Sequence, residues 1–161
     1  MIANSLGLRL EFISMKNYLS FALLGAAALM TSCGTPVLPE SSLSENERSL
    51  LSAINQSRQA HGKAPLEASK SLTDLARKDA QRRVSAGNDY EDQRGQTGYE
   101  RLLTLSGRGR GGSELGSDLM AVWRKTPLQK QLLEGSFSGV GVGTATGANG
   151  LETGVVLLGG F

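Results

Sequence analysis

The chain has 161 residues, a formal net charge of +2, and a composition that is 39% hydrophobic and 20% charged. These values are typical of one ordinary globular domain, and they exclude a wholly disordered chain or a tail that binds polyanions. A net charge this close to zero does not indicate the nature of a partner.

Residues 1–32 are predicted to be a signal peptide. Lys16 and Asn17 precede YLSFALLGAAALM, an apolar run that is shorter than the roughly 20 residues needed to span a bilayer but suits a signal. Residues 1–14 fit poorly as the start of such a signal, whereas Met15 with Lys16 begins a conventional one. Met15 is therefore an alternative start of translation.

Cys33, the only cysteine, is the predicted site of lipid attachment. It ends the stretch MTSC, which resembles a bacterial lipoprotein signal, where small residues precede a cysteine that is acylated before the signal is cut. We therefore expect an exported protein whose Cys33 becomes the first residue and anchors the chain to a membrane of the cell envelope. An ordinary signal peptide followed by an unmodified thiol is the alternative. Gly34, in place of aspartate, favours the outer membrane in a cell that has one.

The predicted folded domain spans residues 44–161, after a tether over 33–43 that holds two of the four prolines and several serines. The domain is predicted to open with a helix over 44–62. Ser44 and Glu47 form a capping box at its start, and apolar residues follow at helical spacing.

A second helix is predicted over 71–87, opened by Ser71. Asp79 and Arg83 lie four residues apart on it, near its buried stripe. We interpret them as an ion pair at the margin of that stripe, worth a few tenths of a kcal/mol, rather than as catalytic residues.

Residues 87–98 show no periodicity and are predicted to form a surface loop, whose acidic residues lack the ligand spacing of a calcium-binding EF-hand. Residues 106–116 are predicted to be a flexible loop because they are rich in glycine. They contain a formal G-x-G-x-x-G pattern, but no strand-helix-strand unit surrounds it, so no nucleotide site is expected. Arg108 and Arg110 provide too little positive charge for a nucleic-acid partner.

A third helix is predicted to begin at Ser117 and to stop before Pro127, with Trp123 anchoring the core. Thr126 and Gln129 predict a capping box for a short fourth helix, which has proline at its first position.

Two strands are predicted to form a hairpin over 137–161. In the first, Val140 and Val142 share one face, and alternating glycines leave the other face bare so that a neighbouring backbone can lie close. The second is apolar on both faces over 155–158. We therefore expect it to be buried on both sides within a layered α/β structure.

The order of these elements resembles the CAP superfamily, which includes cysteine-rich secretory proteins, antigen 5 and plant pathogenesis-related proteins, and especially its short bacterial members. The resemblance covers residues 47–161. It is carried, in chain order, by LLSAINQSRQAHGKAPL, SLTDLARKDAQRRVSAG, GSELG in place of Gly-Glu-Asn, WRKTPLQKQLL in place of a Trp, Ser-Pro and Leu-Leu run, and FSGVGVG. It implies an α-β-α sandwich around a small antiparallel sheet.

Family members often carry two histidines and two acidic residues that face a cleft and can bind zinc. Only Glu114, in GSELG, matches this set, which makes it a vestigial cleft residue. The first histidine position falls within 90–92 and the second at Leu128 or Gln129, and neither holds histidine. His61, the sole histidine, is placed to cap carbonyls at the end of the first helix. We therefore expect no catalytic residue, no metal and no cofactor.

Three hypotheses for function follow. The first is a lipid-anchored, non-enzymatic CAP-like domain of the bacterial envelope that binds a peptide, a glycan or an apolar small molecule, or has a structural role there. The second is a divergent hydrolase that uses Glu114 with acids of the 87–98 loop, which would require a polar partner of shifted pKa. The third is an unrelated small structural lipoprotein, which a structure without a helix-covered antiparallel sheet would favour.

Overall fold

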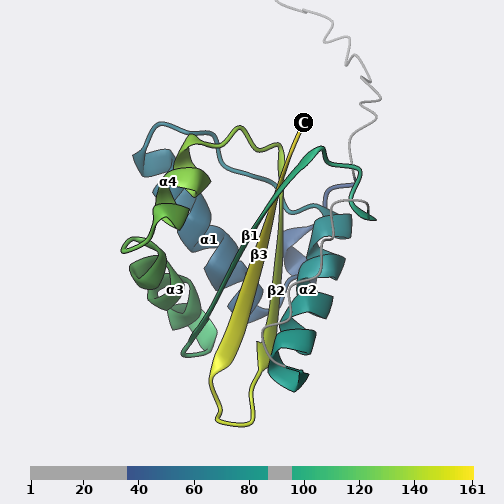
Figure 1. Cartoon of the computed structure of the whole chain (residues 1–161), viewed down its shortest axis with the longest axis vertical. Helices are drawn as coiled ribbons and strands as arrows, with labels where there is room; N and C mark the ends of the chain where they lie inside the picture. Colours follow the sequence, from purple (N-terminus) through teal and green to yellow (C-terminus); the bar gives the residue numbers. More distant parts are fainter. Residues whose placement is uncertain (1–35, 87–95) are drawn as a thin grey trace, which may run out of the picture. The chain divides into compact units, whose positions relative to one another are not determined.

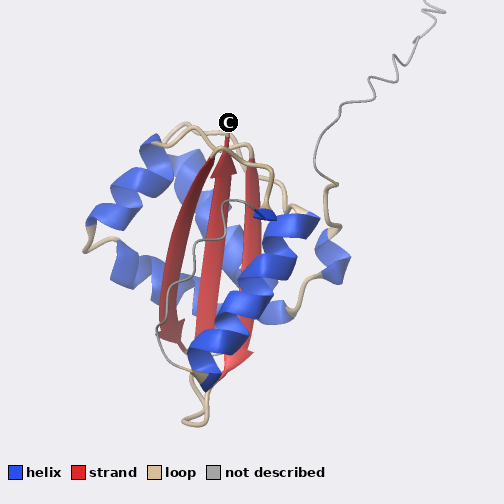
Figure 2. Ribbon diagram, turned by 45° about the vertical axis from the view of Figure 1, so that its right-hand side comes forward, coloured by secondary structure: helices blue, strands red, loops and turns tan. Residues whose placement is uncertain are grey.

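The computed structural model describes residues 36–86 and 96–161, which form three layers (Figure 1). The middle layer is an antiparallel sheet of three strands in the order β1-β3-β2. Helix α2 covers one face, and helices α1, α3 and α4 cover the other, as Figure 2 shows with α2 in front of the strands. The predicted α-β-α sandwich around a small antiparallel sheet is confirmed. The elements are β1 (Arg101–Gly109), β2 (Gly139–Thr146), β3 (Glu152–Gly160), α1 (Glu45–Ala60), α2 (Lys70–Ser85), α3 (Leu115–Trp123) and α4 (Pro127–Glu134).

Strand β3 lies at the centre of the sheet, and all of its residues are buried. Val156 pairs with Leu105 of β1 and with Val142 of β2, and this layer of side chains faces α1 and α3. The next residue, Leu157, faces α2 from the other side of the sheet. The prediction that this strand is buried on both faces is therefore confirmed.

The glycines of β2 let α2 lie directly against the sheet. A Cβ atom placed on Gly141 would be 2.1 Å from the carbonyl carbon of Leu72, and one on Gly143 would be 2.2 Å from that of Ala76. Such distances are far below ordinary van der Waals contact, so no side chain larger than hydrogen fits there. The predicted close approach of a neighbouring backbone is confirmed, and the neighbour is α2.

The ends of α1 and α2 follow the sequence signals with one correction. Ser44 and Glu47 form the predicted capping box at the start of α1, whose last turn runs into Gly62 at a φ of +69°. Helix α2 begins at Lys70, with Ser69 as its N-cap, so Ser71 lies inside it. The Ser71 hydroxyl hydrogen-bonds the Ser69 hydroxyl at 3.1 Å instead of capping the helix.

The prediction of a flexible loop over 106–116 is wrong. Strand β1 continues to Gly109, and a short 3-10 turn, η3 (Gly112–Glu114), leads directly into α3. The glycines serve packing here, because a Cβ on Gly107 would lie 2.6 Å from Leu119 Cδ2 of α3. The glycine content of the segment therefore reflects a close helix rather than flexibility.

Helix α3 also begins earlier than predicted. Its N-cap is Glu114, and the Ser117 hydroxyl donates to the Glu114 carbonyl at 2.8 Å from within the first turn. Trp123 is the predicted core anchor: its ring is 1% exposed, and its Nε1–H donates to the Ser106 carbonyl at 3.1 Å. At the start of α4, the Thr126 hydroxyl accepts from the amide of Leu128, not from that of Gln129.

The described part of the predicted tether, residues 36–43, is folded onto the domain. The Lys70 amide donates to the Pro36 carbonyl at 3.0 Å, and the Leu38 amide donates to the Ala68 carbonyl at 2.6 Å. A 3-10 turn, η1 (Glu40–Ser42), follows, and Leu43 is 3% exposed in the core. The folded domain thus starts before Ser44.

No helix within residues 36–86 and 96–161 has both the length and the apolar character required to cross a membrane. The predicted signal peptide and Cys33 lie outside the described residues.

Candidate functional site

Glu114 lies at the junction between η3 and α3, where β1 has just ended. Its side chain is 55% exposed, and its carboxylate pairs with the Arg110 guanidinium at 2.8 Å. The same guanidinium contacts Asp118 on the first turn of α3 through two bonds, from Nε at 3.1 Å and from Nη2 at 2.8 Å. The Arg110 amide also donates to Asp118, at 2.9 Å. Glu114 therefore belongs to a cluster of ion pairs on the surface, together with Arg110 and Asp118.

The contact between Arg110 and Asp118 shifts the pKa of both groups. Hydrogen bonds from the Arg110 side chain and amide lower the pKa of Asp118 to about 2. The bond to Asp118 in turn raises the pKa of Arg110. Asp118 and Arg110 are therefore both charged at neutral pH, and the cluster fastens the end of β1 to α3.

Two side chains of helix α1 hold the GSELG turn by hydrogen bonds to the backbone of the turn. Asn46 accepts a hydrogen bond from the Gly112 amide. The Ser49 hydroxyl accepts from the Gly116 amide at 3.1 Å and donates to the Ser113 carbonyl at 2.9 Å. Sequence reasoning missed these contacts, whose only local signal is a pair of polar residues three apart on one side of α1.

Gly116 makes this docking possible. A Cβ atom at this position would lie 2.3 Å from the Ser49 carbonyl oxygen, so α1 and α3 cross with their backbones in contact. Gly112, with a φ of +71°, turns the chain just before the crossing. The second glycine of GSELG is therefore required by helix packing, independently of any role of Glu114.

A shallow hollow of about 400 Å³ lies beside this turn, between α1 and the start of α3. Ser113 and Ser117, on either side of Glu114 in the chain, contribute to its wall. The remaining lining comes from one face of α1 and is mostly polar: Glu45, Arg48, Ser49, Ser52, Ala53 and Gln56. These side chains offer hydroxyl and amide groups to a ligand, although most of the surface exposed within the hollow is apolar.

The position of the family's second histidine lies away from Glu114. Its two candidates, Leu128 and Gln129, are on the first turn of α4, beyond the far end of α3, and Leu128 packs against the core. The nine residues of α3 separate them from Glu114, which is about 13 Å of helix. Gln129 lines a second hollow, of about 430 Å³, together with His61 and Lys63. The structure thus does not bring Glu114 and Gln129 to one hollow, and the 90–92 position lies outside the described residues.

Those residues of the family set that lie in the described part of the chain do not fit a zinc site. Within the described ranges, no group of three or more histidine, cysteine, aspartate or glutamate side chains is arranged to hold a metal ion. Glu114 already pairs with an arginine, and Gln129 offers only an amide. His61 is engaged as predicted at the end of α1, with Nδ1 2.7 Å from the Ser57 carbonyl oxygen.

Asp79 and Arg83 form the predicted ion pair, but it is buried rather than marginal. Asp79 is 3% exposed, and its two oxygens accept from Arg83 Nε at 3.0 Å and from Arg82 Nη2 at 2.8 Å. Removing one partner of a buried pair costs more than the few tenths of a kcal/mol expected for an exposed pair. The contacts of Asp79 with its own helix indicate a structural role.

A second buried carboxylate, Glu47, joins α1 to α2. Its oxygens accept from Arg77 Nε and Nη2, both at 2.7 Å, while the Ser44 amide donates to it at 2.9 Å. Burial alone would raise the pKa of Glu47, but the Arg77 and Ser44 bonds outweigh burial and lower it. Neither buried carboxylate lines either of the two hollows described above.

Comparison with known proteins shows the same fold in solved structures and identifies the family of the chain. Solved structures that resemble the chain include an outer surface protein of Borrelia burgdorferi, with a TM-score of 0.61, 16% identity, and coverage of 79% of this chain and 98% of that one. Venom allergen-like protein 4 of Schistosoma mansoni matches with a TM-score of 0.58 and 15% identity, covering 73% and 90% of the two chains.

An extracellular protein of Bacillus anthracis that contains an SCP domain matches with a TM-score of 0.52 and 17% identity, over 80% of this chain and 45% of that one. No curated protein sequence matches the chain. The sequence model of the family described as CAP, the cysteine-rich secretory protein family, matches residues 51–158. This match excludes the hypothesis of an accidental resemblance, and the chain belongs to the CAP family.

Proposed function

We propose that this CAP domain is an exported, lipid-anchored protein of the bacterial envelope that acts as a binding or structural module and not as an enzyme. One observation carries the proposal. Glu114, the residue that matches the family's cleft set, pairs with Arg110 on the surface, while Gln129, one of the two candidates for the second histidine position, lines another hollow, and Leu128, the other candidate, packs against the core. Arginine keeps its proton, so this pairing favours an ion-pair role for the Glu114 carboxylate over proton transfer.

The location rests on the start of the chain and on the relatives. An apolar run followed by MTSC is typical of a lipoprotein signal, so Cys33 would carry the lipid. Two of the structural neighbours are described as an outer surface protein and as an extracellular protein, both from bacteria. These features together favour export followed by retention at a membrane.

The hollow beside Ser113 and Ser117 is the place where the module would bind its ligand. Most of its lining side chains carry hydroxyl, amide or charged groups, while most of the surface that they expose within the hollow is apolar, so the ligand class stays a peptide, a glycan or an apolar small molecule. Because the hollow is shallow and lies along one helix, contacts would be spread over α1 rather than concentrated on a single group.

The anchor is tested by mass spectrometry of the mature protein from its native host. We expect an N-terminus at an acylated Cys33 in the wild type and an unlipidated protein for Cys33→Ser. An unmodified N-terminus at another residue would remove the anchor from this proposal.

The absence of catalysis is tested with a panel of ester, peptide and glycoside substrates. We expect no turnover above the uncatalysed rate for the wild type, and therefore no difference in Glu114→Gln. Turnover that is lost in Glu114→Gln but kept in Arg108→Gln, a change to a nearby arginine of β1, would establish the hydrolase hypothesis instead.

A further inference from the structure

A third hollow lies on the face of the sheet that α2 covers, where the last turn of α2 lies beside the end of β1 (Figure 2). Its volume is about 330 Å³. The described residues that line it are Arg83, Ser106, Gly107, Arg108 and Thr153. Two of them carry guanidinium groups, two carry hydroxyl groups, and none carries a carboxylate. We call this cavity the arginine hollow.

The register of the sheet places three of these side chains on one face. Thr153 of β3 lies directly opposite Arg108 of β1, and Ser106 lies opposite Val155. Val155 packs against α2, and side chains two residues apart in a strand share a face. Ser106, Arg108 and Thr153 therefore all point to the α2 side of the sheet. Arg83 reaches the same hollow from the helix.

The donor groups of the arginine hollow are not used by the described part of the chain. Arg83 donates from Nε to Asp79 at 3.0 Å, whereas its two Nη groups make no hydrogen bond to a described residue. The Arg108 guanidinium has neither a hydrogen bond nor an ion pair within residues 36–86 and 96–161. The hydroxyls of Ser106 and Thr153 also have no partner in these ranges. Four donor groups are thus available to a ligand.

Two of these groups belong to buried side chains and still reach the hollow. Arg83 is 9% exposed and Thr153 is 4% exposed. The Nη groups of Arg83 and the Thr153 hydroxyl are not among the polar atoms that are fully enclosed without a partner, so they face the open volume of the hollow. Because burial already restricts both side chains, a ligand that binds them loses little conformational entropy.

The nearby buried carboxylates do not neutralise the arginine hollow. Asp79 accepts a hydrogen bond from Arg82 Nη2 at 2.8 Å as well as the bond from Arg83, so two guanidinium groups share one negative charge. Glu152 directly precedes the threonine of the hollow in β3 and therefore points to the other face of the sheet, where it accepts from a hydroxyl of β2 at 2.8 Å. Among the described residues, the hollow keeps an excess of positive charge.

We propose that the arginine hollow binds a tetrahedral oxyanion of the phosphate or sulfate class. Each guanidinium group presents a planar fork of N–H donors that matches two oxygens of such an anion. The hydroxyls of β1 and β3 supply donors from another direction. A planar carboxylate, which has two oxygens, would leave part of this donor set unpaired. The hollow lies on the opposite face of the sheet from the GSELG turn, so the proposal depends neither on Glu114 nor on the lipid anchor.

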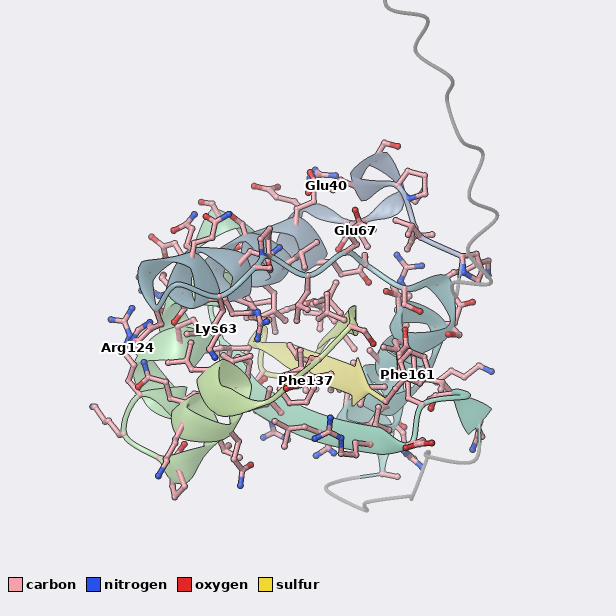
Figure 3. All side chains as sticks on the ribbon, turned by 90° about the horizontal axis from the view of Figure 1, so that it is seen from above. Glu40, Lys63, Glu67, Arg124, Phe137 and Phe161 are labelled. Atoms are coloured by element: carbon pink, nitrogen blue, oxygen red, sulfur yellow. The ribbon has the colours of Figure 1, made fainter. Side chains whose placement is uncertain are left out.

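The experiment uses the mature chain, residues 33–161, with Cys33→Ser so that no lipid is attached. Inorganic phosphate, inorganic sulfate and acetate are titrated separately at neutral pH and followed by amide chemical shifts, with the ionic strength held constant by chloride. The test variant is Arg108→Gln, because this side chain is exposed and holds no described element in place. The matched control is Arg124→Gln, which removes the same charge from an exposed arginine after α3. Figure 3 shows Arg124 on the opposite side of the molecule from α2.

We expect saturable binding of phosphate or sulfate, with the largest shifts at residues 106–108 and 153. Binding should weaken about tenfold or more in Arg108→Gln and should be retained in Arg124→Gln. The anion that binds more tightly identifies the class of ligand. An absence of saturable binding by both tetrahedral anions, or shifts centred away from the arginine hollow, would overturn the proposal. Equal weakening in the two variants would overturn it as well, because binding would then follow net charge. Acetate that binds as tightly as phosphate and sulfate would exclude recognition of a tetrahedral group.

Discussion

Replacing Gly141 with alanine tests the close contact between α2 and the sheet. The new Cβ would lie 2.1 Å from the Leu72 carbonyl carbon and 2.3 Å from the Leu72 carbonyl oxygen. Carbon atoms in ordinary contact are about 3.5 Å apart or more, so α2 would have to move away from β2 by about 1.4 Å. The contacting atoms belong to the helix backbone, and a rotamer change cannot relieve the clash.

The cost follows from what that movement uncovers. On its inner face α2 buries Leu72, Leu75, Ala76 and Ala80 against the sheet. A gap of this size forfeits half or more of the dispersion energy of those contacts. We expect Gly141→Ala to lower the free energy of unfolding by about 3 kcal/mol, at the upper end of the range for overpacked cores.

The assay is urea unfolding followed by the fluorescence of Trp123, the only tryptophan. Gly111→Ala is the matched control, because Gly111 has a φ of −75° and a Cβ there would meet its nearest neighbour at 3.6 Å. We expect this control to change stability by no more than about 1 kcal/mol.

Gly143→Ala provides a second check on the same reasoning. Its Cβ would lie 2.2 Å from the Ala76 carbonyl carbon, so a single outward shift of α2 relieves both clashes. The double variant should therefore cost clearly less than the sum of the two single changes. A cost below about 1 kcal/mol for Gly141→Ala, or strict additivity, would refute the rigid contact between α2 and β2.

Three further predictions concern the core, a buried ion pair and the family site. Trp123→Ala should destabilise the domain by about 3 to 5 kcal/mol, measured by circular dichroism in urea; a loss below about 0.5 kcal/mol would mean that the ring is not a core anchor. Arg77→Gln should cost about 2 kcal/mol at pH 7, because the buried Glu47 carboxylate loses its partner while Arg77 itself is partly exposed. Since the folded state lowers the pKa of Glu47, the stability from this pair is present above its unfolded pKa of about 4.3 and is lost as pH falls through the folded value, so the cost of Arg77→Gln should shrink at pH 3. An undiminished cost at that pH would contradict the assignment. Glu114→Gln should leave zinc binding by calorimetry unchanged, whereas a stoichiometric site of micromolar affinity or better that disappears in this variant would show that the family site is intact.

Local sequence signals predicted those parts of the fold that depend on local chemistry. The capping box at Ser44 and the period-two pattern around Val140 and Val142 each rest on residues a few positions apart, and both are confirmed. The strand over Arg101–Gly109 was not predicted, because glycine in its second half indicates both flexible turns and close helix contacts. Only the position of Leu119 against Gly107 distinguishes the two.

The candidate site was predicted less well, because its geometry depends on contacts between distant residues. Ser49 and Gly116 are 67 positions apart, and Glu47 and Arg77 are 30 apart. The burial of Asp79 likewise depends on how α2 packs against the sheet, and the periodicity of its apolar residues alone does not specify that packing. Glu114 could be chosen from its motif, but its partner Arg110, which also binds Asp118, becomes apparent only when β1 and η3 bring Arg110 alongside α3.

If Cys33 carries the proposed lipid, the attachment of residues 36–43 to the domain limits how far the domain can stand from the membrane. The Pro36 carbonyl is bonded to Lys70 at the start of α2, so only Gly34 and Thr35 separate Cys33 from the first fastened residue. Three fully extended residues reach roughly 10 Å. An acyl chain on Cys33 would therefore hold the N-terminal end of α2 within headgroup distance of the bilayer. The domain would rotate about a short linker and would stay close to the membrane surface. Lengthening this linker with inserted residues would change the distance and the tilt of the domain relative to the membrane and would leave its fold unchanged.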